Sequence, residues 1–172
     1  MKWLFLLLAL PFLLVTTCAL LGSFLPRQHE ATRQAVFHRT PAELFALVRD
    51  FANTAAWRTG LKSVELLPPR DGRPCYREAA GHRAVTYVVL EERLAEKLVV
   101  KIDDDDLPYG GSWTYEFSAA PEGARVRITE HGEVKNVVFR FLGRFVFGYD
   151  TTIDTYLRDL GKKVGETVTP GP

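Results

Sequence analysis

The chain has 172 residues, with 22 lysines and arginines against 21 aspartates and glutamates, so its formal net charge is +1 at neutral pH. This balance argues against nucleic-acid binding, which usually shows a strong excess of basic residues. The two cysteines, Cys18 and Cys75, lie in very different segments, so we expect no internal disulfide.

The N-terminal segment has the most unusual composition. Residues 3–25 read WLFLLLALPFLLVTTCALLGSFL and carry no acidic or basic side chain. A helix of about 23 residues, rising roughly 1.5 Å per residue, matches the ~30 Å hydrocarbon core of a bilayer. We therefore predict a single-pass transmembrane anchor over residues 1–26. Two alternatives stay open: a cleaved secretory signal ending near Gly22, and a lipoprotein signal acylated at Cys18.

The charges that flank this segment give opposing signals for its orientation. Lys2 and the amino terminus favour a cytoplasmic start, whereas Arg27 and Arg33 favour the reverse. Of the two orientations, we lean to the one that places the following domain on the extracytoplasmic side.

The domain over residues 27–166 begins with a predicted strand and a helix. Residues 31–39 alternate as a strand does, and Thr40, Pro41 and Glu43 then form a helix start. Threonine caps the helix, proline suits its first turn, and a glutamate three residues after the cap completes a capping box. The helix should continue to Phe51, with one more short turn over residues 53–57.

The next part of the domain changes to a period of two residues. Strands are expected near residues 62–68, 74–79, 84–92, 97–103, 111–119 and 124–134, separated by turns rich in glycine, proline and aspartate. Strands joined by such short connections must be antiparallel.

The last predicted element is one long amphipathic helix over residues 137–166. Its apolar residues fall at steps of three and four, which is the pattern of a helix with one buried face. Gly143 and Gly148 suggest a bend or close packing within it. Residues 167–172 offer little apolar content, so we expect a frayed, disordered tail.

Alternation along two strands places Glu130 on an inward face. Trp113, Tyr115 and Phe117 share one face of strand 111–119, and Glu130 shares the inward face of the next strand with Val126 and Ile128. A buried carboxylate is costly unless it is paired or hydrated. Glu130 is therefore the one weak catalytic candidate, as a general base, or else holds the polar end of a ligand. The structural alternative is pairing with Arg140 or Arg58.

No pattern in the sequence predicts a metal or a cofactor. Asp103–Asp106 is a run of four aspartates without the ligand spacing of a calcium loop, and the four histidines are scattered. Glycine-rich nucleotide motifs and the nucleophile elbow of serine hydrolases are absent from the sequence. We expect Cys75 to be a buried free thiol.

Residues 40–51 followed by Trp57, with a long helix after an antiparallel sheet, resemble the START/Bet v 1-like superfamily, also called the polyketide cyclase/dehydrase-like or SRPBCC proteins. Together with the anchor, residues 128–134 and 139–149 resemble a membrane-anchored bacterial subgroup of unassigned activity. The resemblance implies an α+β helix-grip fold, in which a curved antiparallel sheet surrounds the long C-terminal helix and leaves a cavity.

The resemblance also implies that the cavity takes an apolar small molecule: a lipid, an isoprenoid, a quinone or a polyketide-like compound. A non-catalytic binding or transfer module is the first hypothesis, with a cyclase- or hydrolase-type enzyme and a protein-interaction domain with a filled core as alternatives. The same aromatic side chains would line a cavity or fill a core. Candidate ligand-binding residues are Trp57, Tyr87, Trp113, Tyr115, Phe117, Glu130, Phe141, Phe145 and Tyr149.

The start of the last predicted helix is apolar nearly all round. Phe139, Val146 and Phe147, with Arg140 and Arg144 one turn apart, could contact lipid head groups near the anchor. The alternative is that they pack under a loop.

Overall fold

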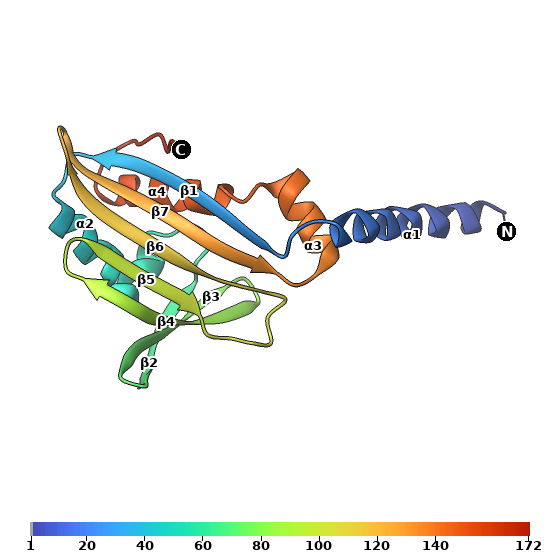
Figure 1. Cartoon of the computed structure of the whole chain (residues 1–172), viewed down its shortest axis with the longest axis horizontal. Coiled ribbons are helices and arrows are strands. Elements are labelled where there is room, and N and C mark those ends of the chain that lie inside the picture. Colours follow the sequence, from blue (N-terminus) through green and yellow to red (C-terminus); the bar gives the residue numbers. More distant parts are fainter. Residues whose placement is uncertain (1) are drawn as a thin grey trace.

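The computed structural model describes residues 2–172, with side chains from Pro11 onward. It is an α+β helix-grip structure, in which a seven-stranded antiparallel sheet packs against a C-terminal helix (Figure 1). The strands are β1 (Gln28–Phe37), β2 (Ser63–Arg70), β3 (Arg73–Ala80), β4 (Arg83–Arg93), β5 (Lys97–Ile102), β6 (Tyr109–Ala120) and β7 (Gly123–Val134). Their order in the sheet is β1-β7-β6-β5-β4-β3-β2.

Local sequence explains the boundaries of these elements. In α2 (Pro41–Arg49) Thr40 and Glu43 form the predicted capping box, and the short 3₁₀ turn η1 (Phe51–Ala56) follows. Asp71 and Gly72 both have positive φ in the two-residue turn that joins β2 to β3. Such a turn matches the twist of the strands that it connects. The predicted first strand, helix, short turn and six further strands are all present.

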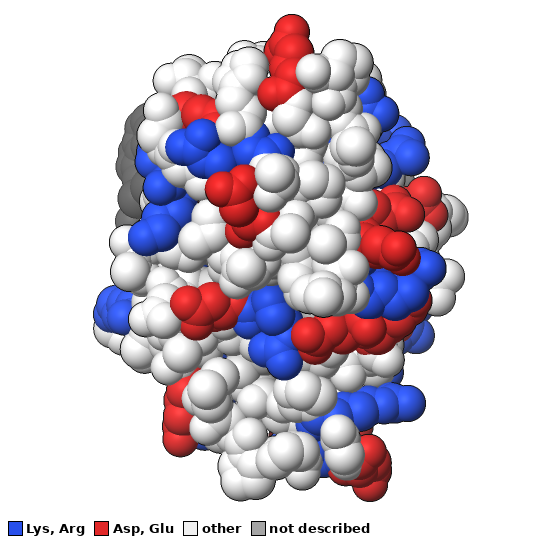
Figure 2. Space-filling view, turned by 90° about the vertical axis from the view of Figure 1, so that its left-hand side faces the viewer, with Lys and Arg blue, Asp and Glu red and all other residues white. Residues whose placement is uncertain are grey.

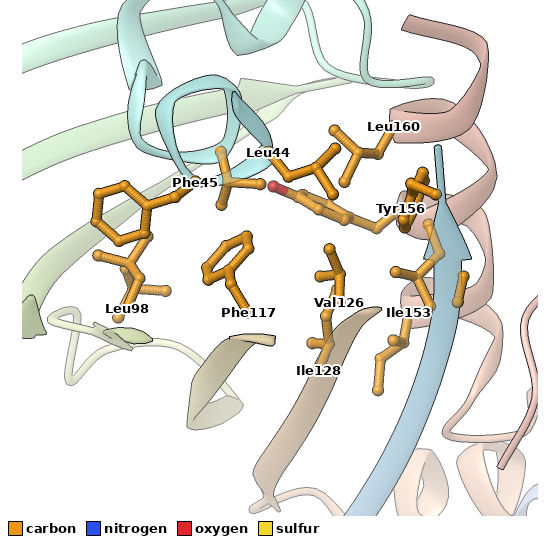
Figure 3. Packing of buried hydrophobic residues seen from close by; sticks show 14 of the residues in the cluster. Leu44, Phe45, Leu98, Phe117, Val126, Ile128, Ile153, Tyr156 and Leu160 are labelled. Atoms are coloured by element: carbon orange, nitrogen blue, oxygen red, sulfur yellow. The ribbon is translucent and has the colours of Figure 1, made fainter. Parts of the chain in front are cut away.

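The core lies between one face of the sheet, α2 and α4 (Thr151–Lys163). Figure 3 shows Leu44 and Leu160 entering from the two helices, while Phe117 and Val126 point at them from the sheet. Leu44, Leu160 and Val126 are completely buried. Burial of each such side chain contributes about 1.5–3 kcal/mol, so α4 is held firmly against β1 and β7.

The prediction of one continuous helix over residues 137–166 is wrong. It is divided into α3 (Val137–Leu142), the π-helix η2 (Gly143–Phe147) and α4. Gly148 breaks it with φ 73° and ψ 148°, a conformation open essentially to glycine alone. The break turns α3 and η2 away from the axis of α4 (Figure 1).

The C-terminal tail is ordered by pairing, contrary to the expectation of a disordered segment. The backbone N–H groups of Gln34 and Gly171 each donate to the other residue's carbonyl at 2.9 Å. Arg33 also donates to the carbonyl of Pro170. Because β1 is an edge strand, the tail satisfies backbone groups that would otherwise be open.

An apolar helix, α1 (Lys2–Ser23), precedes the domain and extends away from it (Figure 1). The predicted anchor over residues 1–26 falls partly on residues 1–10, whose side chains lie outside the described ones. Among the described residues, no helix is both long enough and apolar enough to cross a membrane.

Candidate functional site

A small inner chamber lies between the sheet and α4. Its volume is about 60 Å³, room for a few water molecules, since one water needs roughly 10–15 Å³ of such space. Aromatic residues dominate its wall, and one acidic and one basic residue share it. The lining residues are Arg58, Tyr76, Glu78, Tyr87, Val100, Trp113, Tyr115, Ile128, Thr152, Ile153 and Tyr156.

A larger outer chamber of about 460 Å³ adjoins the inner one and opens to solvent. Tyr87, Trp113 and Thr152 line both chambers, so the two are neighbours across these three side chains. The outer wall combines polar side chains, including His29 and Glu130, with apolar ones from the sheet, α3 and η2. A molecule with one polar end and an apolar body therefore finds suitable surroundings here.

An ion pair between Arg58 and Glu78 forms the polar end of the inner chamber. Glu78 points inward because it shares a face of β3 with Tyr76, and Arg58 follows η1. The Arg58 guanidinium also lies over the ring of Tyr156, 5.1 Å from its centroid. Burial disfavours the charge on Arg58, but Glu78 and the nearby tyrosines outweigh this and hold the Arg58 pKa above its usual value.

Four tyrosines surround this ion pair. Burial is the main reason why the pKa values of Tyr76, Tyr87, Tyr115 and Tyr156 are all raised above the usual value for tyrosine. Their hydroxyls are therefore neutral and able to donate at physiological pH. In the described part of the chain, none of these hydroxyls forms a hydrogen bond with another protein group.

Glu130 lies in the outer chamber beside an indole and an imidazole. Its Oε2 accepts a hydrogen bond from Trp113 Nε1 at 3.0 Å, and its Oε1 lies 3.4 Å from His29 Nε2. The His29 ring stacks on Tyr149 with centroids 3.7 Å apart, and its Nδ1 is buried without a hydrogen-bond partner. The expected partners of Glu130, Arg140 and Arg58, are not its partners here.

Arg140 caps a turn instead of facing solvent. It is buried and donates to the carbonyls of Val134, Lys135 and Leu25. These bonds fix the chain where β7 meets α3. The expectation that Arg140 contacts lipid head groups is therefore wrong, whereas Arg144 is exposed.

The structure brings five of the nine candidate ligand-binding residues to the chambers. Tyr87, Trp113 and Tyr115 line the inner one, and Tyr87, Trp113, Glu130 and Tyr149 line the outer one. A role in ligand binding for these residues stays a prediction.

The other four candidates lie outside both linings. Phe117 packs edge-on against Phe45 in the core, 5.4 Å between centroids. Trp57 packs edge-on against Tyr156. Phe141 and Phe145 pack on each other, 5.1 Å between centroids, in the segment that the break at Gly148 separates from α4.

Sequence reasoning missed Tyr76, Glu78 and Arg58 as chamber residues. The alternation argument that singled out Glu130 applies equally to β3, where Tyr76 and Glu78 are two residues apart and share the inward face. Arg58 had no such signal, because it lies in the irregular segment after η1.

Several other charged groups of the domain are paired locally. Arg70 pairs with Asp103, and Lys135 Nζ donates to the carbonyl of Asp105 at 2.9 Å. Among the described residues, no three histidine, cysteine, aspartate or glutamate side chains gather as a metal site would require. Cys18 and Cys75 are both free thiols.

Comparison with known proteins agrees with this architecture. Residues 28–163 match the sequence family described as polyketide cyclase/dehydrase and lipid transport. A search among curated proteins gives no match.

Several solved structures share the fold at low sequence identity. A START superfamily protein from Mycobacterium smegmatis superposes with a TM-score of 0.60 at 14% identity, covering 81% of this chain and 98% of that one. For a protein from Thermus thermophilus the TM-score is 0.61 at 20% identity, covering 80% and 96%. The di-domain ARO/CYC protein StfQ of the steffimycin biosynthetic pathway gives 0.61 at 11% identity, covering 81% of this chain and 52% of that one. The chain thus spans about half the length of the di-domain protein.

Proposed function

Because the chain belongs to the polyketide cyclase/dehydrase and lipid-transport family, we propose that it binds or transfers an apolar small molecule that carries a neutral oxygen group. Lipids, isoprenoids, quinones and polyketide-like compounds fit this description. Residues 27–166 form the ligand-binding domain in this proposal.

The observation that carries the proposal is the cluster of tyrosine hydroxyls in the inner chamber. Tyr76, Tyr87, Tyr115 and Tyr156 line it, and their raised pKa values keep the hydroxyls neutral. The four tyrosines border the chamber, so a group placed there can reach their hydroxyls. A carbonyl or hydroxyl oxygen of a ligand would accept these hydrogen bonds.

The ion pair beside the tyrosines favours a neutral polar end over an anionic one. Arg58 would attract a carboxylate, but Glu78 already balances its charge. A second carboxylate would lie next to Glu78 and repel it in a poorly hydrated space. Quinone carbonyls, phenols and alcohols avoid this cost.

The sizes of the two chambers suggest how such a ligand would be oriented. The inner chamber, at about 60 Å³, has room only for a small polar end. The outer chamber, at about 460 Å³, has room for an apolar body against Trp113, Tyr149 and Phe147. Concave, largely apolar sites with a few fixed polar groups are typical of small-molecule binding.

The proposal includes an anchor over residues 1–26 that holds the domain at a membrane, on the extracytoplasmic side. Its support is the uncharged segment of residues 3–25. The apolar side chains of α1 are also exposed, with Phe12, Leu13 and Leu14 each more than half exposed. Ligands of the proposed classes dissolve in the bilayer, so an anchored domain would lie close to its supply.

Mass spectrometry of the intact full-length protein, purified in detergent, tests the proposal. We expect an apolar molecule to co-purify with the wild type. In the variant Thr152→Trp, a bulky ring would occupy the junction of the two chambers, and the bound mass should be lost. Thr152 is at an exposed position of α4, so the fold should tolerate the change.

The matched control is Arg158→Trp, which adds the same ring to the exposed side of α4. It should retain the bound mass. Failure of every preparation to carry an apolar molecule would oppose the proposal and favour a protein-interaction domain.

A second candidate function, catalysis on the bound molecule, has one specific observation in its favour. Glu130 and His29 face each other at 3.4 Å and both line the outer chamber. Histidine and glutamate are the side chains that most often serve as general bases. Turnover of a bound ligand that Glu130→Gln abolishes, while binding persists, would identify a cyclase- or hydrolase-type enzyme.

A further inference from the structure

The segment of α3 and η2 carries an exposed apolar surface. It consists of Phe139, Phe145, Val146 and Phe147, which are 44%, 63%, 60% and 64% exposed; we call it the α3–η2 surface. Single exposed apolar side chains are normal, but three consecutive ones beside a fourth form a patch that usually marks a contact.

The α3–η2 surface lies at the base of α1, and the contact between α1 and α3 is close. A Cβ atom on Gly22 would come within 1.9 Å of the carbonyl oxygen of Val137, so the two backbones touch there. Arg140 Nη1 donates to the carbonyl of Leu25 at 3.2 Å. Phe24, which is 81% exposed, continues the apolar character from α1 to α3.

The opposite end of the domain has a different character. Figure 2 shows this end, where acidic and basic side chains are interspersed over the surface. That mixture is typical of a face in contact with water. Among the described residues, the large apolar side chains that are more than 40% exposed lie in α1, at Phe24 and in the α3–η2 surface, with Leu66 and Leu94 as the exceptions.

The same segment also forms part of the mouth of the outer chamber. Phe139 and Phe147 belong to the α3–η2 surface and line the chamber, together with Gly143 and Gly148. Whatever covers this surface would lie against the opening through which a ligand enters.

We propose that a lipid bilayer is the partner of the α3–η2 surface and that the mouth of the outer chamber faces the lipid. This membrane contact extends the proposed function, and exchange of a ligand with the bilayer rests on that function. The contact itself does not need a ligand. Continuity with α1 supports a bilayer as the partner, because most exposed side chains of both segments are aliphatic or aromatic. Aromatic side chains are favoured at the membrane–water interface.

The contact is apolar and does not depend on anionic lipid. Arg144 is the exposed cation of the segment. The loop between β5 and β6, with Asp103–Asp106, lies at the same end of the domain, because Lys135 donates to the Asp105 carbonyl. Acidic and basic groups therefore offset each other at this end of the domain. We expect vesicles of phosphatidylcholine alone to support the contact.

Spin labels on the full-length protein in phosphatidylcholine vesicles test this proposal. Cys18→Ser leaves Cys75 as the native thiol, and Cys75 is buried and inaccessible to label. A nitroxide is then attached at Phe145→Cys or at Leu94→Cys. Leu94 is also a strongly exposed apolar residue, at 81%, but lies in the turn between β4 and β5, which makes it a matched control.

The measurement compares how often the label collides with oxygen, which concentrates in lipid, and with a nickel chelate, which stays in water. At position 145 we expect collisions with oxygen to be several-fold more frequent. The label at position 94 should show the reverse. Val146→Asp should lower the oxygen preference at position 145, because it would place a charge among lipid chains. Val146 does not line either chamber.

Equal access of the chelate to positions 145 and 94 would overturn the proposal. Spin–spin coupling at position 145 that disappears on dilution with unlabelled protein would also overturn it, because a second copy would then cover the surface. Neither result bears on the co-purified ligand measured by mass spectrometry, so failure of the membrane contact and failure of ligand binding are distinguishable.

Discussion

Trp113 Nε1 donates a hydrogen bond to Glu130 Oε2 at 3.0 Å, and the two residues are direct partners on β6 and β7. This contact gives the inward carboxylate of β7 a structural partner as well as a place in the outer chamber. It also fixes the orientation of the indole that lines both chambers.

Glu130→Ala and Glu130→Gln should therefore differ in stability. Alanine leaves the half-buried indole N–H without its protein partner, which costs at most roughly 1–3 kcal/mol, the range for a fully buried donor. The amide oxygen of glutamine still accepts the bond, so the loss should be less than half as large. Urea unfolding of both variants measures this, and equal losses would contradict the assigned bond.

Breaking the Arg58–Glu78 pair should be more costly. Both side chains are largely buried, so Glu78→Ala leaves the Arg58 charge uncompensated, at a cost of roughly 3–5 kcal/mol. Replacing both partners with Arg58→Met and Glu78→Leu should recover most of the loss. A double mutant no more stable than Glu78→Ala would argue against the coupling of this pair.

The buried tyrosines should make the domain sensitive to alkali. Burial raises the pKa values of Tyr76, Tyr87, Tyr115 and Tyr156, so the native state retains protons that the unfolded state releases. These retained protons stabilise the native state. The stabilisation is complete below the ordinary tyrosine pKa of about 10 and is lost as pH rises toward the native pKa values. Tyrosinate absorbance of these four should appear together with unfolding.

A single substitution provides the control for the alkaline effect. Tyr156→Phe removes one titrating group, so the fall in unfolding free energy above pH ~10 should be shallower by up to about 1.4 kcal/mol per pH unit. An unchanged slope would mean that Tyr156 ionises equally well in both states.

Gly148→Ala should destabilise the domain, because φ 73° with ψ 148° strains any residue with a Cβ atom. We expect a loss of about 1–3 kcal/mol in thermal or urea unfolding. Gly110→Ala is the control, since a Cβ atom there meets nothing within 4 Å and its φ lies outside the positive region. Similar losses of stability in the two variants would contradict the role of Gly148 in dividing the last helix.

The strand and helix pattern of the domain could be predicted from sequence because local signals agree with it. The capping box at Thr40 and the alternation in β6 and β7 are examples. The division of the last helix could not be read from periodicity, because α3, η2 and α4 keep an apolar pattern across Gly148. The positive φ of Gly148 marks the break between η2 and α4.

The candidate site was predictable on the strands but not beyond them. Tyr115 and Trp113 followed from alternation, whereas Arg58 reaches the chamber from an irregular segment. Phe117 shares the inward face of β6 with Tyr115, yet it lies near α2 and is covered by Phe45. Pattern fixes the face of a strand, but the packing of distant elements decides which positions on that face border a cavity.

Titration of the full-length protein in detergent with menadione, a two-ring quinone, tests most directly whether the chambers bind an apolar molecule with a neutral oxygen. Quinones quench nearby tryptophans, so the fluorescence of Trp113, which lines both chambers, should fall saturably. Tyr115→Phe should weaken binding roughly 2- to 10-fold, the range for one lost hydrogen bond. A decrease that does not saturate, or that persists unchanged in Trp113→Phe, would contradict ligand binding between the sheet and α4.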